Sequence, residues 1–346
     1  AASGGMLLLP RTVLARPAVA PPPAQRTIYV SNASMLTAAL ANARAGDHIV
    51  LNNGVYRGQF RLERSGTASA PIVVRAASSL AASISGQVHL VGDNVQLWSV
   101  RIQDNSVFVY GNGAKVMRCR FERGPQSKGS ITCFLMSGTD AEISANEFLE
   151  LSNRGISMRL AYGVRRPTIT YNFFKNFRGT PGTNVHEPIQ LGYGSNDAYV
   201  SLGAVVMYNL IDSCAVDDEA ISIKSSDNLV AYNTVVNSYR SAIHVRRGAR
   251  NRLVGNWVEN AGGIRVMDLG NILVSNYSQG GKYNWIEIYA GNAEAGRYSP
   301  DAYYPAAKDT RLSGNIGRVL VGRTYSSASP PMTIRAMNTV IEAHKG

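Results

Sequence analysis

The sequence lacks any hydrophobic run long enough to cross a membrane. A membrane-spanning helix needs about 20 consecutive apolar residues, and no stretch of the 346 residues approaches that length. We therefore expect a soluble protein without a membrane partner. The Pro- and Ala-rich segment that ends at about residue 26 has only a short apolar run interrupted by proline, a poor match to a signal peptide. We interpret residues 1–26 as a tail or the remnant of a leader.

Cysteine is scarce as well. Cys119, Cys133 and Cys214 match no zinc motif, and an odd number leaves at least one of them outside any disulfide. We expect all three to be small, buried apolar side chains.

Acidic residues are outnumbered by basic ones, and no long basic run is present. The 35 Lys and Arg residues against 23 Asp and Glu give a net charge of +12. Such an excess favours an anionic partner, which could be nucleic acid, a membrane surface or an acidic polysaccharide. Because the basic residues are scattered, we do not expect a nucleic-acid-binding arm.

Helical patterns are almost absent. One helix is predicted after Ser34, a candidate N-cap, with Leu36 and Leu40 on one face and Gly46 after its end. The rest of the chain consists of short alternating apolar runs broken by Gly, Asn and Asp, the pattern of β-strands.

What the sequence does contain is a repeat. Asparagines recur in similar settings, 20 to 37 residues apart. They are Asn146, Asn172, Asn209, Asn233, Asn256 and Asn276. One short set of strands per repeat predicts a parallel β-helix. We expect these asparagines to lie at turns, to tolerate left-handed backbone geometry and to hydrogen-bond to their counterparts in neighbouring coils.

A second column of short motifs is more informative. Its tetrapeptides begin at Ile156, Ile189, Ile221, Ile243, Ile264 and Ile286. The first and third positions are always apolar, so they are predicted to fill the core, while the second and fourth positions face outward. One outward row then reads Ser157, Gln190, Ser222, His244, Arg265 and Glu287. The next row reads Arg159, Gly192, Lys224, Arg246, Met267 and Tyr289.

In this register Lys224 and Arg246 become outward-facing neighbours on adjacent coils. Two adjacent cations repel each other unless an anion lies over them. The acidic stretch "DDEAISIKSSDN", Asp217 to Asn228, lies immediately beside them in the chain. An isolated surface lysine or arginine is usually only solvated, but this strip of several cations favours a site for an anionic ligand.

Several segments together resemble polysaccharide lyase family 6, the group of chondroitinase B and alginate lyases. They include "LTAALANARAGDHIVLNNGVYRGQFRL", "NVHEPIQLG", "DDEAISIKSSDNLVAYNT", "HVRRGARNRLVGNWV" and "GGIRVMDLGNILVSNY". The resemblance covers roughly residues 28 to 290, and none is found beyond about residue 296. It implies an all-β fold, a single right-handed parallel β-helix with a short N-terminal capping helix, which we expect over residues 27–346.

The resemblance also implies functional residues. The family's catalytic lysine and arginine correspond to Lys224 and Arg246, with Arg247 in place of the usual histidine. Its calcium ligands correspond to Asn184, Asp217 and Glu219, with Asp217 standing where glutamate is usual. Residues expected to bind the substrate are Arg159, Glu187, Gln190, His244, Arg247, Arg265 and Tyr289.

Enzymes of this family cleave uronate polymers by β-elimination. The resemblance implies that Lys224 removes the C5 proton, that Arg246 neutralises charge at the leaving oxygen, and that Ca²⁺ binds the substrate carboxylate. Strand alternation alone would place Asp217 and Glu219 on the face opposite Lys224, because their offsets are odd. We therefore predict that both acids lie in the turn before the strand.

Alternatives remain open at this stage. We expect alginate as the substrate, with dermatan-type chondroitin next. A polygalacturonase-like hydrolase would also use paired aspartates, but its companion motifs are missing. A non-catalytic polysaccharide-binding β-helix is the third possibility. For the lyase, we expect a monomer that is secreted or periplasmic.

Overall fold

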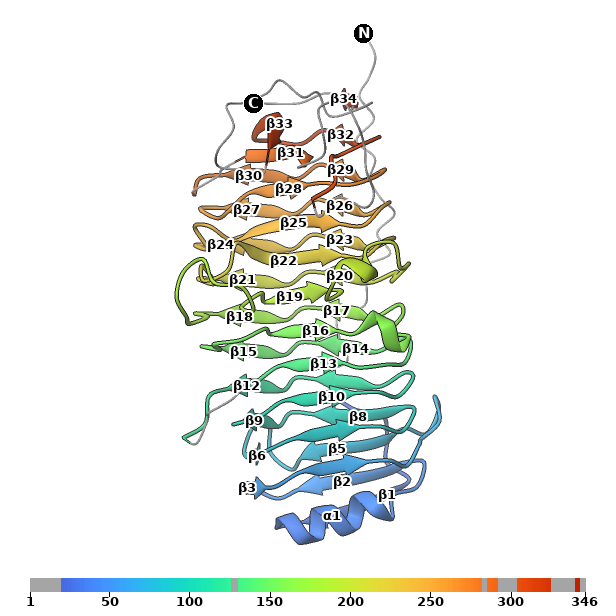
Figure 1. Ribbon diagram of the computed structural model, residues 1–346. Helices are drawn as coiled ribbons and strands as arrows, with labels where there is room; N and C mark the ends of the chain where they lie inside the picture. Colours follow the sequence, from blue (N-terminus) through green and yellow to red (C-terminus); the bar gives the residue numbers. More distant parts are fainter. Residues whose placement is uncertain (1–19, 126–129, 282–284, 292–303, 325–339, 343–346) are drawn as a thin grey trace.

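The computed structural model describes residues 20–125, 130–281, 285–291, 304–324 and 340–342. Within these residues the chain forms a right-handed parallel β-helix, in which short strands stack into three parallel sheets along one axis (Figure 1). This confirms the predicted fold class. The predicted tail begins with residues 1–19, which lie outside the described residues, and the first strand starts at Arg26.

Sheet 1 has 13 strands and runs the length of the solenoid. Its strands are β1 (Arg26–Val30), β2 (Asp47–Leu51), β5 (Ile72–Ala76), β8 (Val95–Trp98), β11 (Lys115–Met117), β14 (Glu142–Ser144), β17 (Thr168–Thr170), β20 (Val205–Met207), β23 (Leu229–Ala231), β26 (Arg252–Val254), β29 (Ile272–Val274), β32 (Arg311–Ser313) and β34 (Val340–Glu342). The central residue of most of these strands is a buried Ile, Val or Leu that points into the core.

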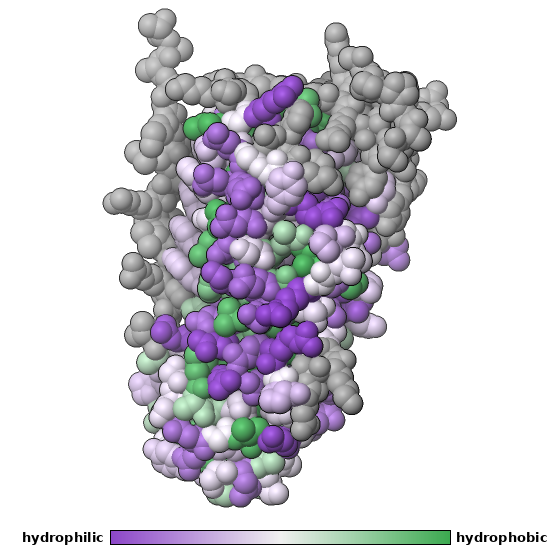
Figure 2. All heavy atoms as spheres, turned by 90° about the vertical axis from the view of Figure 1, so that its left-hand side faces the viewer, coloured by the Kyte–Doolittle hydropathy of each residue, from purple (hydrophilic) through white to green (hydrophobic). Residues whose placement is uncertain are grey.

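Sheet 2 has ten strands and a polar exterior. Its strands are β3 (Gly54–Arg57), β6 (Ala82–Ser85), β9 (Arg101–Gln103), β12 (Arg120–Glu122), β15 (Glu147–Leu149), β18 (Phe173–Lys175), β21 (Leu210–Asp212), β24 (Thr234–Val236), β27 (Trp257–Glu259) and β30 (Tyr277–Gln279). Ion pairs link neighbouring rungs, such as Arg120 with Glu147 at 2.6 Å. Figure 2 shows this side of the molecule, where hydrophilic residues cover much of the surface.

Sheet 3 has 11 strands and contains the predicted column of motifs. Its strands are β4 (Phe60–Leu62), β7 (Val88–Leu90), β10 (Val107–Val109), β13 (Cys133–Leu135), β16 (Ile156–Met158), β19 (Ile189–Leu191), β22 (Glu219–Lys224), β25 (Ala242–Arg247), β28 (Ile264–Val266), β31 (Trp285–Gly291) and β33 (Arg318–Thr324). The leading isoleucines of the motifs pair with one another from β16 to β31, as predicted.

The helix α1 (Ala33–Ala41) covers one end of the solenoid (Figure 1). Leu36 and Leu40 are buried against the first coils, as predicted. The predicted cap was wrong by two residues, because Asn32 has extended backbone geometry and its side chain accepts a hydrogen bond from the Met35 N–H at 2.9 Å. Ser34 lies inside the first turn. No helix in the described part of the chain is long and apolar enough to cross a membrane. Two short 3₁₀ helices, η1 (Leu160–Tyr162) and η2 (Ser195–Asp197), lie in loops.

The core is a stack of apolar layers. The isoleucines at the start of the sheet 3 motifs are fully buried, and the rings of Phe121, Phe148 and Phe174 stack with centroids 4.5 and 4.7 Å apart. The three cysteines are free and buried, as predicted. Complete burial of one apolar layer by the next is what stabilises each short strand.

The recurrent asparagines form a continuous buried ladder. Asn209 Nδ2 donates to Asn233 Oδ1 at 2.9 Å, and that same oxygen accepts the Asn209 backbone N–H at 3.1 Å. The pattern continues from Asn146 to Asn315. The predicted hydrogen bonding is confirmed, but the left-handed residue is the one before each asparagine, such as Tyr232 with φ 54°. The turn is therefore made by the preceding residue, and the asparagine closes it.

Candidate active site

The site lies on the exterior of sheet 3, where β19, β22 and β25 are adjacent. Gln190, Ser222 and His244 pair across these strands in the predicted row. They point away from the core, but each is no more than 1% exposed. Arg265, in the same row, is 3% exposed. These side chains therefore form the floor of the site: they have the predicted outward orientation but are not exposed to solvent.

A bulge at the start of β22 places Glu219. This residue pairs with Ala242, whereas Ile221 pairs with Ile243, so Ala220 is an extra residue in the strand. Ala220 is fully buried in the core, which turns Glu219 outward, to the face of Lys224. The prediction that both acids lie in the turn was right for Asp217 and wrong for Glu219, which begins the strand.

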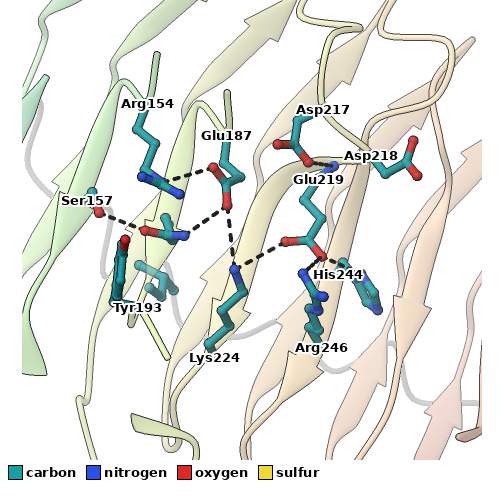
Figure 3. A network of polar contacts seen from close by, with 12 residues as sticks. Arg154, Ser157, Glu187, Tyr193, Asp217, Asp218, Glu219, Lys224, His244 and Arg246 are labelled. Atoms are coloured by element: carbon teal, nitrogen blue, oxygen red, sulfur yellow. Dashed lines mark hydrogen bonds and ion pairs between the residues drawn. The ribbon is translucent and has the colours of Figure 1, made fainter. Parts of the chain in front are cut away.

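A second irregularity follows in the partner strand. Lys224 pairs with Arg247, because β25 has one extra residue at this point. The prediction that Lys224 and Arg246 are neighbours on adjacent coils is confirmed, but the register between them differs by one residue from that of the repeat. Their side chains nevertheless converge on one carboxylate (Figure 3): Lys224 Nζ lies 3.8 Å from Glu219 Oε2 and Arg246 Nη1 lies 3.4 Å from Glu219 Oε1. Arg247 is buried beside them.

Glu187 is the second carboxylate at Lys224, and the two lie 3.5 Å apart between Nζ and Oε1. Gln190 Nε2 donates to Glu187 Oε1 at 2.9 Å, and Ser157 Oγ donates to Gln190 Oε1 at 2.7 Å (Figure 3). Arg154 Nε lies 3.0 Å from Glu187 Oε2. Arg154 was missed because it lies in the turn before β16, outside every repeated row. Lys224 thus lies between two buried carboxylates, each of which also contacts an arginine.

His244, in the floor of the site, contacts the Glu219 carboxylate. Its Nδ1 lies 3.1 Å from Glu219 Oε1, and since a carboxylate only accepts hydrogen bonds, Nδ1 carries the proton. Burial, followed by the charge of Arg265, lowers the pKa of His244 to about 4, so the ring is neutral at pH 7. Burial alone would raise the pKa of Glu219, but the hydrogen bond from His244 and the charges of Lys224 and Arg246 lower it below its ordinary value.

Asp217 is the third buried acid in this region. Its carboxylate accepts hydrogen bonds from the backbone N–H groups of His186 at 3.3 Å and Glu219 at 3.2 Å. Burial and the negative charges of Glu187 and Glu219 raise the pKa of Asp217 to about 7. The carboxylates of Glu187 and Glu219 are therefore close enough to Asp217 to disfavour its ionised form.

Several buried polar atoms at the site lack a hydrogen-bond partner within the described residues. They are Ser222 Oγ, His244 Nε2, Arg154 Nε, Glu187 Oε2 and Glu219 Oε2, of which the last three do take part in the ion pairs described above. Buried polar groups in folded proteins are nearly always hydrogen-bonded. A cluster of unsatisfied atoms that includes two carboxylate oxygens indicates a place for a polar ligand.

The remaining predicted residues surround this centre. Asn184 lies in an exposed loop, and its backbone carbonyl contacts His186 Nδ1 at 3.0 Å. The guanidinium of Arg159 lies 3.7 Å from the ring centroid of Tyr193. Tyr289 is 5% exposed, and its ring lies 6.3 Å from that of His244.

Tyr304 is a further contact that the sequence did not indicate. Arg246 Nη2 donates to the Tyr304 hydroxyl at 2.7 Å, and the guanidinium lies 5.1 Å from the ring centroid. Tyr304 lies after the last recognisable motif, so no repeat pointed to it.

The profile of the family described as chondroitinase B matches residues 30–286. The chain belongs to this family. The resemblance stated from the motifs is thereby confirmed, and the match spans every residue of the site except Tyr289 and Tyr304. No curated protein matches the chain.

Solved structures share the fold of this chondroitinase B family member. A mannuronic-acid-specific polysaccharide lyase family 6 enzyme from human gut microbiota is 18% identical, with a TM-score of 0.72 over 92% of this chain and 82% of its own. The family 6 lyase Pedsa3628 from Pseudopedobacter saltans is 17% identical, with a TM-score of 0.68 over 92% of each chain. The alginate lyase AlyF-OU02 is 18% identical, with a TM-score of 0.67 over 91% of this chain and 82% of its own.

Proposed function

We propose that the protein is a polysaccharide lyase that cleaves alginate by β-elimination. The observation that carries this proposal is the arrangement of charges on the exterior of the β-helix. Lys224 lies between Glu187 and Glu219, and Arg246 contacts Glu219 as well. Membership of the chondroitinase B family supports the reaction class. Alginate is supported by neighbours described as alginate lyases or as specific for mannuronic acid.

The reaction needs a base and a group that stabilises negative charge. Lys224 Nζ, in its uncharged form, accepts the C5 proton, and the C5–H electron pair forms the C4=C5 double bond. The C4 oxygen leaves with its bonding pair and takes up a proton from water. The adjacent substrate carboxylate makes the C5 proton poorly acidic, so cationic groups must neutralise the charge of this carboxylate. Arg246 supplies positive charge near the leaving oxygen, but a guanidinium hardly deprotonates and is not the ultimate proton source. His244 and Gln190 act through the carboxylates that they hold.

We propose calcium as the cofactor, held by Asn184, Asp217 and Glu219. The donor chemistry fits, because carboxylate and amide oxygens are the ligands that Ca²⁺ prefers, and Glu219 Oε2 lacks a hydrogen-bond partner among the described residues. No three His, Cys, Asp or Glu side chains within those residues are already placed to hold an ion, so binding requires the side chains to rearrange. Bound calcium would neutralise the substrate carboxylate.

The function is tested by incubating the protein with alginate and, separately, with dermatan sulfate while ultraviolet absorbance is followed. We expect absorbance from the new double bond with alginate, loss of activity after thorough chelation, and recovery when Ca²⁺ is returned. Faster cleavage of dermatan sulfate than of alginate would mean that dermatan sulfate is the substrate. New reducing ends without absorbance would indicate a hydrolase, and binding without turnover would indicate a non-catalytic module. Activity that survives chelation would remove calcium from the proposal.

Tyr304 provides a separate prediction. Tyr304→Phe keeps the ring beside Arg246 but removes the hydroxyl that accepts its hydrogen bond. Because a hydrogen bond to a charged group contributes about 1.5–3 kcal/mol, we expect kcat to fall by about tenfold or more. Tyr162→Phe, at a tyrosine that is 67% exposed, is the matched control. An unchanged kcat would show that this contact does not position Arg246 for the reaction.

A further inference from the structure

The outward row that forms the floor of the site continues toward the N-terminal end as aromatic residues. Phe134 pairs with Ser157, Phe108 with Phe134, and His89 with Phe108. Tyr110 immediately follows β10 and lies beside His89. We call His89, Phe108, Tyr110 and Phe134 the aromatic strip. It lies on the same face of sheet 3 as Lys224.

The rings of the strip form one nearly continuous surface. His89 and Phe108 stack with centroids 4.8 Å apart, and Phe108 and Phe134 with centroids 5.4 Å apart, the rings of each pair inclined by 15°. The alternate residues of these strands, including Val107 and Val109, are fully buried. Phe108, Tyr110 and Phe134 are only partly buried. The strip is therefore not part of the core. Its rings cover one another's faces, and their partly exposed edges form an apolar surface on the exterior of sheet 3.

Polar groups accompany the rings. His89 is 7% exposed, its Nε2 lies 3.0 Å from Gln59 Nε2, and its Nδ1 has no hydrogen-bond partner within the described residues. Burial and then the charge of Arg61 lower the pKa of His89, so the ring is neutral at pH 7. A buried, unpaired ring nitrogen beside apolar faces indicates a ligand that has both apolar surface and hydroxyl groups.

The strip is continuous with the proposed active site. Strands in a sheet lie about 4.8 Å apart, so Phe134 lies roughly 14 Å and Phe108 roughly 19 Å from the strand of Lys224. Arg159 follows β16, between the strip and Lys224, and Arg61 precedes His89 in the same outward row. An anionic chain along this face would therefore meet cations at both ends of the aromatic surface.

We propose that the aromatic strip is a binding platform for the distal sugar units of the polysaccharide whose cleaved bond lies at Lys224. This inference rests on the proposed function. Pyranose rings present apolar C–H faces that pack on the exposed apolar ring edges of the strip, while their hydroxyl groups meet His89 and Gln59. Their carboxylates meet Arg159 and Arg61. A substrate that ends before β13 cannot reach the strip, so the platform acts only on longer chains.

The test compares Phe134→Ala and the Phe108→Ala/Phe134→Ala double variant with the parent protein on purified oligosaccharides of increasing length. We expect kcat/KM on long chains to fall by about tenfold, which corresponds to about 1.4 kcal/mol for the lost apolar contact. We expect the value on the shortest cleaved chain to stay unchanged, which also shows that the variants fold. Phe173→Ala, at a partly buried outward phenylalanine on sheet 2, is the matched control.

Loss of activity by the same factor at every length would overturn the platform, and so would an unchanged kcat/KM on long chains. If the parent protein cleaves no polysaccharide, the proposed function fails and binding of intact alginate is measured instead. Weaker binding by the double variant than by Phe173→Ala would then support the platform alone. Equal binding by the two would remove it.

Discussion

Lys224→Arg is expected to lower kcat on alginate by about 10²–10⁴-fold, the contribution of a positioned general base. The substitution keeps a positive charge between Glu187 and Glu219, which contact Lys224 at 3.5 and 3.8 Å. An arginine hardly deprotonates, so it cannot accept the C5 proton. The variant therefore separates the role of Lys224 as a base from its role as a counter-ion. Initial rates from ultraviolet absorbance provide the measurement.

Lys115→Arg is the matched control, because Lys115 pairs with Glu142 at 2.7 Å on a different sheet. We expect it to leave kcat unchanged. Lys224→Ala should lose at least as much activity as Lys224→Arg, and it should still bind the polysaccharide. The thermal midpoints of all variants show whether a loss of activity reflects unfolding. Near-parental turnover by Lys224→Arg would exclude Lys224 as the base.

Asn233→Ala is expected to lower the free energy of unfolding by about 3 kcal/mol or more, since each buried polar group left unpaired costs about 1–3 kcal/mol. Asn233 is fully buried. Its Oδ1 accepts from the backbone and the side chain of Asn209, and its Nδ2 donates to Val206 O and to Asn256 Oδ1. Alanine removes all of these bonds. The backbone N–H of Asn209 then loses its acceptor, whereas Asn209 Nδ2 keeps Ile169 O and Asn256 Oδ1 keeps the Asn233 N–H.

Urea unfolding followed by circular dichroism measures this effect. Asn42→Ala is the control, because Asn42 is exposed, has a negative φ, and its Nδ2 donates to the Ala38 carbonyl at 2.9 Å on the surface. We expect a change within about 0.5 kcal/mol for the control, as for most surface substitutions. A similar small change for Asn233→Ala would mean that the ladder follows from the fold without stabilising it.

Much of the fold could be predicted from two patterns. Apolar and polar residues alternate along each strand, and similar motifs recur once per coil, so few folds other than a stacked β-helix fit the sequence. The isoleucines from Ile156 to Ile286 stack as the alternation requires. The asparagine ladder was also predictable, since buried asparagines at matching positions can satisfy one another. The left-handed residue was misplaced by one, because hydrogen bonding does not specify which turn residue has positive φ.

The site was predictable in its residues and less so in its geometry. The alternation pattern assumes that each residue pairs with one residue of the next strand. It therefore could not anticipate the extra residue at Ala220 or the shift that pairs Lys224 with Arg247. Arg154 comes from a turn and Tyr304 from beyond the matched region, where no repeat was available. The outward orientation of Gln190, His244 and Arg265 was predictable but their burial was not, because pointing away from the core does not ensure contact with solvent.

The bulge at Ala220 has an evolutionary consequence. With regular alternation back from Ile221, Ala220 would face outward and the Glu219 carboxylate would lie in the apolar interior. A glutamate at this position is therefore tolerated only in a rung that already holds the bulge. In the history of such a rung, we expect the extra residue to precede the acid.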